Sequence, residues 1–204
     1  MGLLTMALGR AAFLGSGAQS AFRYTVGTAV LCTALMAGLT AAAENEPQEF
    51  AVKAAYLSKF GLYVDWPPTA FSSATSAFTL CVAGEDPFGA DLDKAAANQR
   101  IGNRALVVRR FKTVERDSGC HILYISSTDR RSIRQVLETV HGSNVLVVSD
   151  AASPAAAGAI INFVIKDNRV RFDIDEEAAA RNGLTISSKL LGLALNVKRK
   201  PEAR

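Results

Sequence analysis

The chain has 204 residues, of which 49% are apolar and 21% are charged, and its formal net charge is +4. This length suits one ordinary domain, and this composition excludes a chain that is disordered throughout. Residues 1–43 carry two arginines and no acid, so the remainder has 21 basic and 19 acidic residues; a net charge of about +2 gives no reason to expect nucleic acid as a partner.

Residues 1–43 have the features of a cleavable signal peptide. Two basic residues precede "TVGTAVLCTALMAGL", 15 residues without a charge, and "TAAAENEP" then supplies an Ala-x-Ala site with cleavage after Ala43. A start at Met6 is an alternative, as is an uncleaved anchor, although 15 apolar residues are short for a bilayer. Cys32 is a poor lipidation site because the large Leu31 precedes it. We therefore predict an exported chain that does not stay in the membrane, with a mature domain over residues 44–204.

The first half of the mature chain predicts a helix, two strands and a second helix. "QEFAVKAAYLSKFGLYVDWPP" places apolar residues on one helical face and is expected to stay helical until Pro67 and Pro68. A Ser-rich link leads to a strand over 78–83, and Asp86 is expected to cap a helix that starts near Pro87. The glycine of "RIGNRALVVRRF" predicts a turn before a strand over 105–111. The face of the first helix comprises Phe50, Ala54, Leu57, Gly61 and Val64.

The second half alternates strands with helices and then changes. "CHILYI" and "NVLVVSD" are apolar runs that indicate buried parallel strands, and "SSTDRRSIRQVLETVHG" between them is a helix with a Ser/Thr cap and a stop at Gly142. "GAIINFVIKDNRVRFDID" predicts an antiparallel hairpin that turns at Asp167 and Asn168. Two short helices follow, one ended by Gly183 and one capped by Ser187. We predict a single α/β domain whose mixed, mostly parallel sheet is flanked by helices and ends in a C-terminal antiparallel hairpin.

Several stretches could bind a ligand, but each has a plainer interpretation. "GEDPFG" follows a strand and opens a helix, where phosphate sites occur, yet Glu85 and Asp86 would repel phosphate and Pro87 removes one amide. We therefore interpret it as a strand-to-helix turn. "DIDEE" could hold calcium but suits the acidic start of a helix. Two cysteines and two histidines could hold zinc, but their spacing matches no common site, so we expect neither a metal nor a cofactor.

No catalytic constellation stands out. The sequence lacks G-x-S-x-G, Ser149 and Asp150 have no third partner, His121 lies in an apolar strand, and His141 lies at a helix end. We expect no catalytic residue, and an enzyme that uses Ser149, Asp150 or His121 remains a minor alternative.

The mature chain keeps Cys81 and Cys120, which in an oxidising compartment suggest one disulfide. A bridge between them would join the first and third strands if these strands are neighbours. Three interpretations stay open: a structural staple, two buried thiols that never meet, and a redox-sensitive strut.

The chain resembles the YfiR-like family of periplasmic regulators. The resemblance covers residues 49–197 and rests on "VKAAYLSKFGLYVDWP", "FTLCVAGEDPFG", "CHILYIS", "VLVVSD", "GAIINFVIKDNRVRFDID" and "AAARNGLTISSKLLGLA", which occur in the family's order. It implies a small periplasmic α/β protein without known catalysis. The best-understood member is a dimeric repressor that binds the periplasmic domain of an inner-membrane diguanylate cyclase, which lowers cyclic di-GMP and biofilm growth.

The resemblance also implies a role for the cysteines. Cys81 and Cys120 match one cysteine pair of a member whose activity is linked to its disulfide state. The second pair is absent, because "SDAASPAAAGAIINF" contains no cysteine, and this departure puts redox control in doubt.

We therefore expect a periplasmic, homodimeric binding protein that restrains a membrane signalling enzyme, in particular a diguanylate cyclase. The alternative is a small-ligand receptor for a transporter or sensor kinase. The first candidate partner surface is Tyr63, Trp66 and Pro67, although Trp66 also suits a staple between helix and sheet. The second is the hairpin, with Arg169, Arg171 and Asp173 setting its charge pattern.

Overall fold

The structure is a computed structural model that describes residues 45–126, 130–151 and 158–199. The predicted signal peptide, Cys32 and the Ser/Thr cap predicted at 127–129 lie outside these ranges. Within them, no helix is both long and apolar enough to span a membrane.

The described strands form an eight-stranded mixed sheet in the order β10-β8-β7-β6-β5-β2-β4-β3. Its centre is parallel: β2 pairs with β4 and β5, β5 with β6, and β6 with β7. The β7–β8 pair is the predicted antiparallel hairpin, so the predicted fold class is confirmed. The strands of this sheet are β2 (Phe78–Gly84), β3 (Arg100–Ile101), β4 (Arg104–Phe111), β5 (Ile122–Ser126), β6 (Leu146–Ser149), β7 (Ile161–Lys166), β8 (Arg169–Asp175) and β10 (Val197–Lys198).

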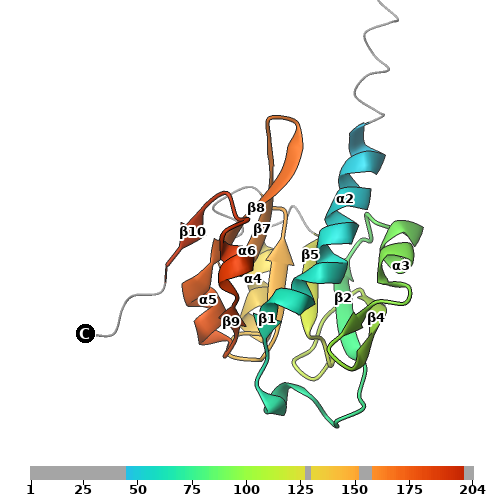
Figure 1. Cartoon of the computed structure of the whole chain (residues 1–204), viewed down its shortest axis with the longest axis vertical. Coiled ribbons are helices and arrows are strands. Elements are labelled where there is room, and N and C mark those ends of the chain that lie inside the picture. The colour runs from blue at the N-terminus through green and yellow to red at the C-terminus, as the bar shows by residue number, and fades with distance from the viewer. Residues whose placement is uncertain (1–44, 127–129, 152–157, 200–204) are drawn as a thin grey trace, which may run out of the picture. The chain divides into compact units, whose positions relative to one another are not determined.

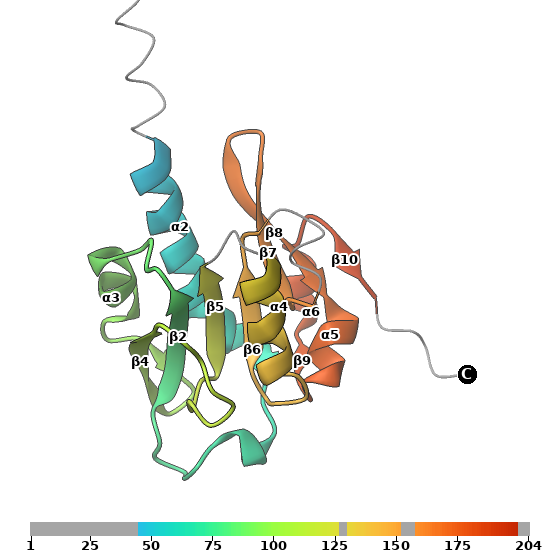
Figure 2. The same cartoon turned by 180° about the vertical axis from the view of Figure 1, so that it is seen from behind.

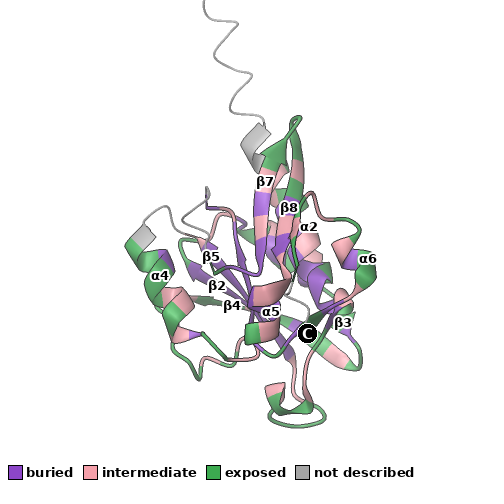
Figure 3. Cartoon of the chain, turned by 90° about the vertical axis from the view of Figure 1, so that its left-hand side faces the viewer, coloured by how far each residue is buried: buried purple, intermediate pink, exposed green. Residues whose placement is uncertain are grey.

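Helices cover both faces of the parallel strands (Figures 1 and 2). Alternate strand residues point to opposite faces, so Leu80 and Tyr124 pack in the cluster that holds α2, whereas Cys81 and Leu123 pack in the cluster that holds α4. Figure 3 shows these strands as the buried centre of the domain. The helices are α2 (Asn45–Phe60), α3 (Ala90–Ala96), α4 (Arg130–Thr139), α5 (Glu176–Arg181) and α6 (Ser188–Leu191).

The first helix ends earlier than predicted. α2 stops at Phe60, a 3-10 turn spans Gly61–Tyr63, and Val64–Asp65 form strand β1. β1 pairs antiparallel with β9 (Thr185–Ile186) in a separate two-stranded sheet, and the Ser187 amide donates to the Tyr63 carbonyl. Pairing with a segment more than a hundred residues away therefore ends the helix before Pro67 can.

The start of α3 and the C-terminal segment also differ from the prediction. α3 begins at Ala90 rather than near Pro87, because Asp86 accepts from the Phe88 amide and caps a loop turn instead of the helix. No strand is predicted after the last helix, but Val197–Lys198 form β10, which pairs parallel to β8; Lys198 also forms ion pairs with Asp175 and Glu177.

The hairpin turn agrees with its sequence. Lys166 pairs with Arg169, and Asp167 and Asn168 both have positive φ, at 50° and 55°. This is the geometry of a two-residue type I′ turn, which suits Asp and Asn because they tolerate left-handed backbone. The hairpin projects beyond the sheet, and its tip is exposed (Figures 1 and 3).

Candidate functional surfaces

A disulfide joins Cys81 to Cys120, and their Cα atoms lie 5.8 Å apart. Cys81 is fully buried in β2, and Cys120 lies two residues before β5, the parallel neighbour of β2. The bridge thus holds two adjacent central strands together on the face covered by α4. The interpretation of two buried thiols that never meet does not describe this structure. The structural staple and the redox-sensitive strut stay open.

His121, next to Cys120 in the chain, belongs to a cluster of aromatic rings. Its imidazole stacks against the rings of Phe71 and Phe78, each with a centroid 4.8 Å away, and the two phenyl centroids are 6.4 Å apart. The Arg104 guanidinium lies 3.8 Å from the centroid of the Phe71 ring. The Thr79 amide donates to His121 Nδ1 at 3.0 Å, so the neutral ring carries its proton on Nε2. Burial is the main cause that lowers the pKa of His121, and the charge of Arg104 lowers it further.

We predict that His121 makes stability depend on pH. Its pKa is about 6.5 when unfolded and lower when folded, so the native state binds fewer protons. The contribution of His121 to the free energy of unfolding is fully present above the unfolded pKa. It falls as pH drops towards the folded pKa, by up to about 1.4 kcal/mol per pH unit. Urea unfolding of wild type and His121→Asn from about pH 7.5 to 5 should show a shallower fall for the variant. The exposed His141→Asn should keep the wild-type slope, and equal slopes for all three would refute the assignment.

The Tyr63–Pro67 segment is held against the sheet. The Trp66 ring meets Phe78 edge to face at 5.0 Å, and its Nε1 donates to the Asn144 carbonyl at 3.1 Å. Trp66, Tyr63 and Pro67 are all half-buried. These contacts are those of a staple, so a partner on this segment would meet partly covered side chains, and its binding role stays a prediction.

The hairpin presents a different surface. Its base is buried, because Phe163 and Phe172 pack on Tyr56 and Phe60 of α2. Towards the tip Ile165 is 51% exposed, and Arg169 and Arg171 are exposed. Asp173 lies at the base and accepts from Asn196 Nδ2 at 2.8 Å. The structure therefore separates Asp173, which ties the hairpin to the segment before β10, from the two arginines.

The two predicted surfaces lie at opposite ends of the domain. α2 runs from the end where the hairpin projects down to β1, beside which the Tyr63–Pro67 segment lies (Figures 1 and 2). The structure therefore does not bring Trp66 together with Arg169 and Arg171, and one small partner domain would engage one surface or the other.

A cluster of charged and polar side chains lies at the carboxyl ends of the parallel strands, and its members are far apart in the sequence. Lys53 of α2 is only 3% exposed, and its Nζ lies 2.5 Å from Glu49 Oε1 and 2.8 Å from Asp150 Oδ2. Burial and the nearby Asp150 carboxylate, to which Tyr124 is hydrogen-bonded, raise the pKa of Tyr124 well above its usual range. Sequence reasoning missed Lys53. The signal was available, because Lys53 is the charged residue in the otherwise apolar helical stretch "FAVKAAYL".

The remaining candidates have structural roles in the described residues. Ser149 is fully buried, and its Oγ accepts from the Ala151 amide. Asp175 of "DIDEE" accepts from the Ala178 amide as the cap of α5. Among the described side chains, no group of three or more His, Cys, Asp or Glu is placed to hold a metal ion.

Comparison with known proteins gives a family and includes a similar crystal structure. A model of the YfiR/HmsC-like family matches residues 50–195. A crystal structure titled as a conserved domain protein from Vibrio cholerae O1 biovar El Tor strain N16961 is 14% identical, with a TM-score of 0.40. That match covers 59% of this chain and 54% of the other, so the chain spans about half of that protein's length.

Proposed function

Because the chain belongs to the YfiR/HmsC-like family of periplasmic regulators, we propose that it binds the periplasmic domain of an inner-membrane signalling enzyme and restrains it. The enzyme is a diguanylate cyclase, so restraint lowers cyclic di-GMP. The observation that carries the proposal is the family match over residues 50–195, which spans nearly every described element.

The hairpin is the surface that we assign to this binding. β6 pairs with β7 only at Ile161 and Asn162, and the segment before β10 bonds to β8 only at Phe172 and Ile174. Nearer the tip, the outer edges of both strands have no strand partner among the described residues. Such an edge can accept an added strand, whose main-chain hydrogen bonds supply affinity.

The charge of the hairpin tip supports a proposal about the chemistry of the partner. Lys166, Arg169 and Arg171 are exposed, and none of them forms an ion pair with a described residue. Asp167 is the acid of the turn, so the tip carries a net charge of +2 from three cations and one carboxylate. We therefore propose that the partner offers an acidic, extended segment, with the exposed Ile165 as an apolar contact.

The proposal is tested by cellular cyclic di-GMP in a parent strain and in a strain that lacks this gene. We expect cyclic di-GMP to rise on deletion and to return to the parent level with a plasmid copy. An unchanged level on deletion would reject the cyclase as the partner and favour the small-ligand receptor. Light scattering of the purified protein tests the homodimer separately.

Charge reversal tests the assigned surface. Arg169→Glu with Arg171→Glu should weaken binding to the partner's periplasmic domain by about tenfold or more, because it replaces attraction to an acidic segment by repulsion. Arg134→Glu with Lys189→Glu is the matched control, since it changes two exposed cations away from the hairpin by the same charge. Calorimetry at two salt concentrations measures both pairs. If both variants bind like wild type, the hairpin is not the surface.

A further inference from the structure

A pocket of about 530 Å³ opens at the carboxyl ends of β2, β5 and β6. The chain leaves β2 through α3 to reach β4 on one side, and then crosses to β5 on the other side. This reversal makes the ends of β2 and β5 a topological switch point, the position where open α/β sheets bind ligands. The pocket lies directly outside it, over Gly84 and Ser126.

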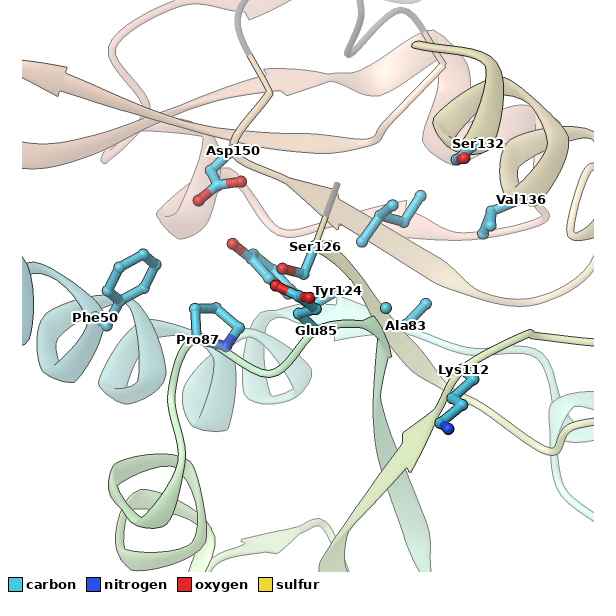
Figure 4. Close-up of a pocket in the computed structure, with 12 residues that line it drawn as sticks. Phe50, Ala83, Glu85, Pro87, Lys112, Tyr124, Ser126, Ser132, Val136 and Asp150 are labelled. Carbon is cyan, nitrogen blue, oxygen red and sulfur yellow. The ribbon is translucent and has the colours of Figure 1, made fainter. Parts of the chain in front are cut away.

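The walls of the pocket come from elements far apart in the sequence. Phe50 of α2 and Pro87 of the loop after β2 form one apolar side, and Val136 of α4 lies on the other. Figure 4 shows the Asp150 carboxylate and the Tyr124 hydroxyl directed towards each other between these walls. Apolar walls with a few converging polar groups, at this volume, are typical of small-molecule sites.

Asp150 is the polar group that is best fixed. Its Oδ2 accepts from Lys53 Nζ at 2.8 Å, and Tyr124 is hydrogen-bonded to the same carboxyl. Lys53 is buried and also lies 4.8 Å from the centroid of the Phe50 ring, while Tyr124 is 1% exposed. Two buried side chains therefore hold the carboxylate of Asp150, which is itself partly exposed towards the pocket.

The charges favour a cation. Glu49 and Asp150 share the single ammonium of Lys53, which leaves one negative charge beside the pocket. Glu85 on the rim adds a second, and the exposed Lys112 offsets one of the two. An anionic ligand would meet this excess of carboxylate, whereas an ammonium group could pair with Asp150 and rest an apolar body on Phe50 and Pro87.

The geometry points to a binding site for a small organic amine, with its ammonium at Asp150 and its apolar part between Phe50, Pro87 and Val136. This site is independent of the proposed partner surface on the hairpin, and it stands whether or not the partner is a cyclase.

Three probes with the same phenyl body test the charge: 2-phenylethylamine, 2-phenylethanol and 3-phenylpropanoate. Amide resonances in a nitrogen-labelled sample report where each binds. We expect 2-phenylethylamine, at up to about 10 mM, to shift Gly84, Ser126 and Phe50 and to bind at least tenfold more tightly than the alcohol, with no binding of the carboxylate. Equal binding of all three, tighter binding of the carboxylate, or no shift at these amides would overturn the proposal.

Two variants test the residues. Asp150→Asn should weaken amine binding by about tenfold or more, and Glu85→Gln by about twofold to fivefold. Because Asp150→Asn also disturbs the buried Lys53, the exposed Glu85 keeps the test valid if that variant fails to fold. Glu138→Gln, an exposed acid on α4 outside the pocket lining, is the control and should bind like wild type. Wild-type affinity in every folded variant would overturn the site.

Discussion

Gly84→Ala should destabilise the domain by about 4 kcal/mol, the sum of a backbone-strain term and an overpacking term. Gly84 ends β2 with φ +93°, a conformation that L side chains rarely adopt. A Cβ there would lie 2.4 Å from the Ser126 carbonyl oxygen. That oxygen belongs to the backbone of the paired strand β5, so no side chain can rotate to relieve the clash. Thermal unfolding should show a midpoint lower by about 8 to 16 °C.

Gly89→Ala is the matched control for this prediction. Gly89 also has a positive φ, at +50°, but no atom lies within 4 Å of an added Cβ. With ψ at −132° this backbone is also unfavourable for alanine, so the control should show only that strain, about 1 to 3 kcal/mol, without the clash. If both variants unfold at the same temperature, the close approach of Gly84 to Ser126 does not limit stability.

Loss of the Cys81–Cys120 bridge should destabilise the domain by a similar amount. The bridge spans 39 residues, and the loss of loop-closure entropy in the unfolded chain is worth about 4 kcal/mol in the chain-entropy model. Cys81→Ala with Cys120→Ala is the suitable variant, because serine would bury a hydroxyl at the fully buried position 81. Urea unfolding measures the loss.

Reductant provides the internal control. Wild type should lose about as much stability in reductant as the double variant loses without it, and the double variant should not respond. If thiol titration shows a reduced wild type of unchanged stability, the bridge is not a staple. The double variant also separates the two open interpretations: if it folds at low temperature and still lowers cyclic di-GMP, the bridge is structural, and if it folds and fails, the bridge takes part in regulation.

Local sequence determined much of this fold. The apolar run "FTLCVAG" predicts a strand over 78–83, and the structure has β2 over Phe78–Gly84. Asp167 and Asn168 accept positive φ and so fix the hairpin register. Ser187 caps α6 through its own hydroxyl. Each of these outcomes depends on neighbours within a few residues, so sequence reasoning found them.

Tertiary structure alone decided the rest. α2 ends at Phe60 because Val64 pairs with Ile186, and β10 forms because Val197 lies beside Ile174. The separation of Trp66 from the hairpin follows from the length and direction of α2, which sequence patterns do not orient against the sheet. The pocket likewise needs α2, the loop after β2 and the end of β6 to meet, so that Lys53 finds Asp150 across 97 residues. Burial of an ammonium is favourable only once both carboxylates are in place, and that condition is set by the folded chain and not by any local stretch of it.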